Sequence, residues 1–256
     1  MKLLFFILFF QVGQILACSC NTQELLSRAS RADFIASAKI ESIKPDPDNS
    51  EYHILQIQIL ELYKGQNIQK IKLHSHLNSS CAMLIEEDSL WLIFADKNKD
   101  GALSFGRCSG SNQLDRKFDE EKYPGLMEGY AKRMMAKQLM LAEAKEVLID
   151  SDIYYSWTVR NNWRPEFKDW YLKENSVGFY ELVIDENFKV MQVISVKGFD
   201  DSKHNEKFLE SLKRNISLYS FSRNENIQRR TSLIIGFYYG KRGKGKSSYI
   251  QQLSTL

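Results

Sequence analysis

Cys18 and Cys20, one residue apart and directly after an apolar segment, are the residues whose types and spacing could do chemistry. Residues 1–17 begin with a charged start, continue through an apolar run and end in Ala17. This is the layout of a secretory signal peptide, and the run is too short to span a bilayer. We therefore predict cleavage after Ala17, which makes Cys18 the first residue of an exported protein.

The cysteine count leaves two fates for Cys18. The chain contains Cys18, Cys20, Cys81 and Cys108, an even set that in an exported protein favours two disulfide bonds. The alternative is an outer-membrane lipoprotein, in which cleavage at the same bond leaves a lipid on the Cys18 sulfur. Lipidation would leave one thiol unpaired, and Ile15 and Leu16 replace the residues usual in lipoprotein signals. We predict a secreted or periplasmic protein with two disulfides, which contacts a membrane only if Cys18 is lipidated.

Residues 18–110 are dominated by strand patterns. A helix is expected after the capping sequence Asn21 to Glu24. Five strand-like segments follow, at residues 33–43, 52–65, 68–76, 88–96 and 102–108. Because no helical pattern separates these segments, they favour a small antiparallel barrel.

The order of these features resembles the netrin-like module, and most closely the amino-terminal domain of the tissue inhibitors of metalloproteinases. The features that carry the resemblance are the Cys-x-Cys start, a long strand ending in Tyr63-Lys64-Gly65, a cysteine after the next strand and a hairpin leading to another cysteine. The resemblance implies an OB-type β-barrel. It also implies the pairs Cys18–Cys81 and Cys20–Cys108. The chain lacks the family's additional bridge and its cysteine-rich second domain.

The same resemblance implies a role for Cys18 and Ser19. In the metalloproteinase inhibitors the amine and carbonyl of the first cysteine chelate the protease zinc, and the next side chain enters the specificity pocket. An α-amine with a pKa of about 7.7–8.0 is accessible in its neutral form near neutral pH. Most netrin-like modules inhibit nothing, and Asn21-Thr22 replaces the inhibitors' proline-containing continuation. We predict a non-enzymatic binding or scaffold protein, with inhibition of a zinc metalloprotease as the alternative.

The second half of the chain has a different pattern. A polar connector and a helix over residues 129–149 fill the segment 111–150. Residues 151–240 contain a hairpin (177–198), a helix (203–216) and a strand (229–240), preceded by a helix near 166–174. This order resembles the carboxy-terminal domain of TonB-like proteins, which implies helices on a three-stranded antiparallel sheet and a bacterial source. We predict a mixed, two-domain protein with a barrel at residues 18–110, an α+β domain at 151–240 and a basic tail at 241–256.

Other motifs are interpreted as structural. Residues 240–247 match a phosphate-binding pattern, but too few residues follow to supply its helix and second strand. Residues 96–101 imitate the start of a calcium loop, whose twelfth position holds Arg107 instead of glutamate. His74 and His76 could form half of a metal site, although no second pair of ligands is visible. We predict that the protein binds no nucleotide and no cofactor and has no metal of its own. A net charge of +3 does not indicate a nucleic-acid partner, and we predict none.

Overall fold

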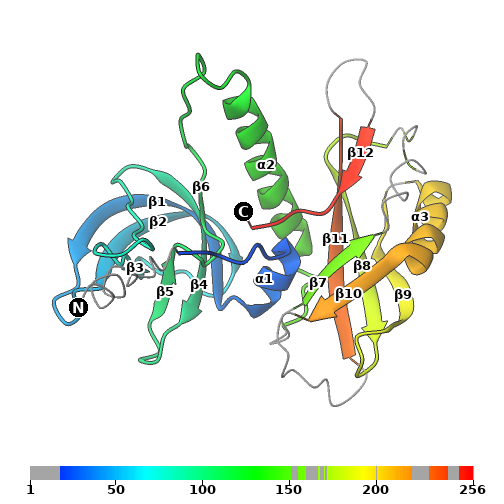
Figure 1. Cartoon of the computed structure of the whole chain (residues 1–256), viewed down its shortest axis with the longest axis horizontal. Coiled ribbons are helices and arrows are strands. Elements are labelled where there is room, and N and C mark those ends of the chain that lie inside the picture. The colour runs from blue at the N-terminus through cyan, green and yellow to red at the C-terminus, as the bar shows by residue number, and fades with distance from the viewer. Residues whose placement is uncertain are drawn as a thin grey trace, which may run out of the picture.

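The computed structural model describes residues 18–150, 155–159, 167, 170, 172–199, 201–220, 231–241 and 248–255 (Figure 1). The first half of the chain forms a barrel and the second half a separate sheet, with helices between and beside them (Figure 1). The predicted signal peptide, residues 1–17, lies outside the described residues. Within the described ranges, no helix is long and apolar enough to cross a membrane.

The first half forms a closed OB-like barrel. Its strands are β1 (Phe34–Pro45), β2 (Tyr52–Lys64), β3 (Lys70–His74), β4 (Leu90–Lys97) and β5 (Leu103–Gly106). They are hydrogen-bonded in the order β1-β2-β3-β5-β4, and β4 pairs back with β1. A short strand, β6 (Asn112–Gln113), pairs with β4. The barrel prediction is therefore confirmed, except that β3 and β5 run parallel and not antiparallel.

Residues 34–38 of β1 and 91–95 of β4 are buried on both faces, because successive side chains of a strand point into two different cores. The barrel interior receives Phe34, Ala36, Ala38 and Ile40 from β1 and Trp91, Ile93 and Ala95 from β4. Ile35, Leu92 and Phe94 point the other way, into a second core. The two-sided burial explains why the run Leu-Trp-Leu-Ile-Phe-Ala of β4 lacks alternation of apolar and polar residues.

The second half forms a sheet with one helix packed on it. Its strands are β8 (Ser176–Ile184), β9 (Val190–Lys197), β11 (Thr231–Lys241) and β12 (Ser248–Gln251). The order is β12-β11-β8-β9, so β12 is a fourth strand in a sheet predicted to have three. Helix α3 (Ser202–Asn215) packs Phe208 and Leu212 against this sheet. Strands β7 (Tyr155–Val159) and β10 (Ile216–Ser220) pair separately. Of the helix predicted near 166–174, residues 166, 168, 169 and 171 lie outside the described residues, and residues 172–174 are not helical.

The barrel and the second sheet share the second core. It contains residues of α1 (Leu25–Arg31), of α2 (Leu126–Ala144), of the outer barrel wall and of β8 and β11. Figure 1 shows α1 and α2 between the barrel and the sheet. On α2, Met134 and Met140 are buried whereas Met135 is exposed. The segment 111–150, predicted as a linker and a helix, therefore contributes side chains to the core that joins the two halves.

The prediction of a solvated basic tail over 241–256 is wrong for residues 248–255. Strand β12 pairs with β11, and the following residues continue to α1, where Ser254 forms a bridge with Glu24. The side chains of Ile250, Leu253 and Thr255 are buried. The sequence prediction treated these residues as part of the basic run before them. Most of the phosphate-binding pattern, residues 242–247, lies outside the described residues.

Two buried ionisable groups lie beside this carboxy-terminal segment. Glu24 is the N-cap of α1, where a carboxylate oxygen accepts a hydrogen bond from the Ser27 backbone N–H at 2.7 Å. Burial raises the pKa of Glu24 to about 8. Lys137 of α2 donates to Asn112 Oδ1 at 2.7 Å and to the Thr255 carbonyl at 3.1 Å, and burial lowers its pKa to about 8. The Lys137 side chain thus connects α2 to β6 and to the carboxy-terminal segment, whereas the Glu24 side chain caps its own helix.

Candidate functional site

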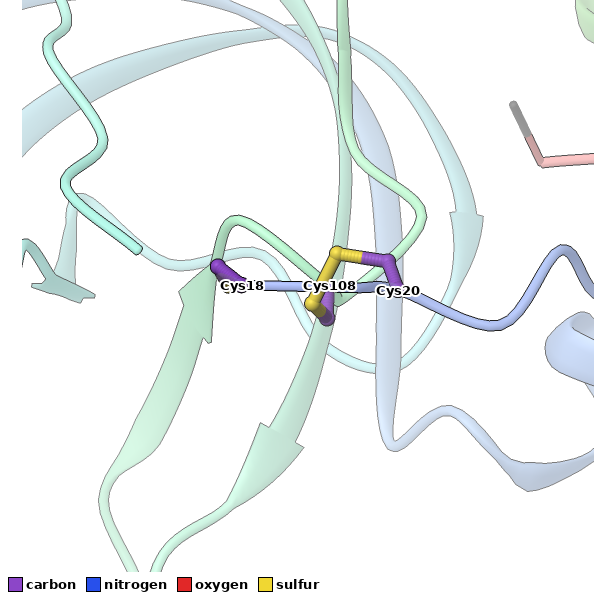
Figure 2. Close-up of side chains that lie close together, drawn as sticks. All are labelled: Cys18, Cys20 and Cys108. Carbon is purple, nitrogen blue, oxygen red and sulfur yellow. A yellow bond between two sulfur atoms is a disulfide. The ribbon is translucent and has the colours of Figure 1, made fainter. Parts of the chain in front are cut away.

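Two disulfides clamp residues 18–20 to the barrel. They join Cys18 to Cys81 and Cys20 to Cys108, the pairs that the netrin-like resemblance implies, with Cα–Cα distances of 5.0 and 5.1 Å. Figure 2 shows the Cys20–Cys108 bond, with Cys18 beside it. Cys108 follows β5, and Cys81 lies in the loop between β3 and β4. Each bond therefore fixes the amino-terminal segment to a different part of the barrel.

Ser19 lies between the two clamped cysteines and is exposed. The backbone nitrogen of Cys18 donates a hydrogen bond to Ser80 Oγ at 3.0 Å, next to the Cys81 attachment. Because both neighbours of Ser19 are covalently held, the segment has little conformational freedom left to lose when a partner binds. The arrangement presents the Ser19 side chain outward on a rigid support.

Two cavities flank this segment. The larger, about 560 Å³, is lined by Cys18 and Cys20 and by Trp91, Arg116 and Tyr130 among others. The smaller, about 350 Å³, lies between Cys18, the two disulfide partners Cys81 and Cys108, and the histidines His74 and His76. Arg107 lines both cavities, and its guanidinium donates to the Ala82 carbonyl at 3.1 Å. Concave surfaces beside a rigid exposed segment can receive side chains from a partner.

A buried arginine connects helix α1 to the barrel next to the second disulfide. The guanidinium of Arg28 on α1 forms two hydrogen bonds with the Asp96 carboxylate, at 2.8 and 2.9 Å, and a third with the Ser109 carbonyl at 2.6 Å. Ser109 directly follows Cys108, so Arg28 fixes the attachment point of the second disulfide. The sequence prediction missed this role, although an arginine within the apolar helix sequence Leu-Leu-Ser-Arg-Ala-Ser is a signal for a buried guanidinium that needs a partner.

The segment that imitates a calcium loop forms a hairpin turn between β4 and β5. The Asp96 carboxylate is paired with Arg28, and Asn98 Oδ1 accepts hydrogen bonds from the backbone N–H groups of Asp100 and Ala102. Gly101 has a φ of 77°, in the left-handed region that favours glycine. These contacts agree with the structural interpretation of residues 96–101.

The structure brings His74 and His76 together and adds a residue that the sequence did not connect to them. Their ring centroids are 3.7 Å apart, and Glu51, which precedes β2, lies beside them. In contrast, His53 contacts Ser75, and His204 lies on α3 in the other half of the molecule.

No protein-family model matches the chain, and a search of curated proteins finds no similar sequence.

Proposed function

We propose that this protein is an exported, non-enzymatic binding protein that contacts a protein partner through the amino-terminal segment Cys18–Ser19–Cys20. The observation that carries the proposal is the exposed Ser19 held between two disulfide-bonded cysteines and flanked by two cavities. A rigid segment loses little conformational entropy on binding, so less of the free energy of its contacts is offset by ordering the chain. The netrin-like resemblance and the predicted signal peptide support a place outside the cytoplasm, secreted or periplasmic.

Photo-crosslinking tests the contact surface. A photoreactive phenylalanine analogue replaces Ser19 in one variant and Met191, an exposed residue of β9, in the control variant. Both proteins are expressed with the leader in the source cells and irradiated. We expect a discrete crosslinked product from position 19 that is absent with position 191. Crosslinks at both positions, or only at position 191, would contradict a partner-binding surface at Ser19.

Inhibition of a zinc metalloprotease is the second candidate, and the clamped Cys18 favours it. Cleavage after Ala17 would leave the Cys18 amine and carbonyl next to each other on a rigid support, as a five-membered chelate requires. The side chain of Ser19 would then be the one directed into the specificity pocket of the protease. Chelation needs an unmodified amine in its neutral form, so inhibition should weaken as pH falls below about 7.7.

Adding one alanine before Cys18 tests the chelate. We expect the extension to abolish inhibition across a panel of zinc metalloproteases, because it displaces the amine from the metal while both disulfides remain. A bulky residue in place of Ser19 should instead change which proteases are inhibited, with little change in stability. Equal inhibition by the mature and the extended protein would refute chelation.

The lipoprotein alternative and the chelate are separated by the mass of the mature protein. A lipid thioether and the Cys18–Cys81 disulfide use the same sulfur atom, so one molecule cannot carry both. Intact-mass measurement without reduction reports the cleavage site, the lipid and the disulfides together.

A further inference from the structure

Glu51, His74 and His76 form a cluster of metal-ligating side chains at one end of the barrel. Their ligand atoms all lie within 4.8 Å of one another, and His74 Nε2 is 3.6 Å from a carboxylate oxygen of Glu51. The cluster combines the residue before β2, the last residue of β3 and a residue of the loop after β3. It is separate from the disulfides, whose cysteine sulfurs are bonded to each other.

Backbone pairing places the three residues together. Tyr52 of β2 lies opposite His74 of β3, so the preceding residue, Glu51, lies beside the loop that contains His76. The buried Ser75 fixes this position, because its N–H and its hydroxyl both donate to the Glu51 carbonyl, at 2.9 and 3.0 Å. The positions of all three candidate ligands are therefore set by the folded backbone.

The imidazole rings are also oriented. The ring of Tyr52 stacks on His74, with centroids 4.5 Å apart and an interplanar angle of 12°. His76 has a φ of 44°, in the left-handed region, and its ring lies 3.7 Å from that of His74. A left-handed backbone is unfavourable for a non-glycine residue and concentrates at functional positions. His74 Nε2 is inaccessible to solvent and has no hydrogen-bond partner among the described residues, an arrangement that a ligand would satisfy.

The donor set determines which ligand fits. Two imidazoles and one carboxylate form the protein ligand set of many zinc sites in which a fourth position stays open. Bonds of about 2.0–2.1 Å in a tetrahedral site place ligand atoms about 3.3 Å apart, whereas the ligand atoms here lie within 4.8 Å of one another, so the side chains move closer together when the metal binds. His74 and His76 also line the smaller cavity beside Cys18, from which water or a partner carboxylate can supply the fourth ligand.

We propose that Glu51, His74 and His76 bind one divalent transition-metal ion, with zinc as the best match. In this site the protein holds its own zinc ion, whereas in the inhibitor hypothesis Cys18 binds the zinc of a protease. The proposed site does not depend on inhibition of a protease.

Calorimetric titration of the tag-free, disulfide-bonded protein with zinc chloride, after treatment with a chelator, tests the site. We expect one zinc ion per chain and a higher melting temperature with zinc. Glu51→Gln, His74→Gln and His76→Asn should each weaken binding by at least about tenfold, and asparagine tolerates the left-handed backbone at position 76. His204→Gln, on α3, is the matched control and should bind like the wild type.

Melting curves of the metal-free variants separate loss of a ligand from loss of the fold. A variant that melts like the wild type without metal but no longer gains stability from zinc supports the site. The proposal is overturned if the wild type binds no zinc, or if Glu51→Gln and His76→Asn bind as tightly as the control. It is also overturned if His204→Gln weakens binding as much as the three ligand variants.

Discussion

A chain that ends after Lys241 should be less stable than the full-length chain by at least about 3 kcal/mol, because it cannot bury Ile250 and Leu253. Burial of such side chains contributes about 1.5–3 kcal/mol each. The truncation also removes the backbone hydrogen bonds of β12 and the Thr255 carbonyl that accepts from Lys137. For a protein of this size, the loss corresponds to a melting temperature lower by about 6–12 °C.

Point variants make this test more specific. Ile250→Ala and Leu253→Ala should each lower the melting temperature, whereas Gln252→Ala, at an exposed position of the same segment, should not. Unfolding followed by circular dichroism measures all of these variants. A truncated protein as stable as the full-length chain would show that residues 248–255 do not contribute to the core.

Removing either disulfide should have an effect of similar size. The Cys18–Cys81 and Cys20–Cys108 bonds join residues separated by 63 and 88 positions. In the chain-entropy model, removing a bond that closes a loop of this length lowers the free energy of unfolding by about 4 kcal/mol. The effect arises mainly because the unfolded chain gains conformational freedom. We expect the double variants Cys18→Ser/Cys81→Ser and Cys20→Ser/Cys108→Ser each to melt at a clearly lower temperature than the wild type.

The control for this experiment is Ser19→Ala, which alters the exposed residue between the cysteines and leaves both bonds intact. Peptide mapping without reduction checks the pairing directly. A Cys18–Cys20 bond in the map, or unchanged melting of both double variants, would contradict the clamp.

The barrel could be predicted because its signals are local or carried by the cysteines. Alternating residues mark β2, and the order of the four cysteines with the Tyr63-Lys64-Gly65 strand end carries the resemblance to the netrin-like module that implied both disulfide pairs. At Gly65, with a φ of 91°, a Cβ would lie 2.8 Å from the Asp33 carbonyl oxygen. Only glycine fits this position without strain, so its presence in the sequence marks the end of the strand.

The shared core could not be predicted, because its contacts connect distant segments. The apolar run of β4 was interpreted only as a barrel strand, and no local signal in it shows that α1 and α2 cover its outer face. The metal-binding cluster illustrates the same limit, since Glu51 meets His74 and His76 only through the pairing of β2 with β3. The carboxy-terminal strand was missed because a basic run precedes its few apolar residues.

The contact between α1 and the segment after β12 determines when the protein can finish folding. The Gln23 carbonyl accepts a hydrogen bond from the Thr255 backbone N–H, 232 positions later, and Leu25 N–H donates to the Leu253 carbonyl. Contacts of such sequence separation form slowly, and during synthesis they must wait until residues 248–255 have left the ribosome. Until then, the amino-terminal helix lacks its neighbour and the shared core stays open. Folding of the shared core is therefore coupled to synthesis of residues 248–255, whereas the barrel interior, whose buried residues end at Phe105, can form earlier.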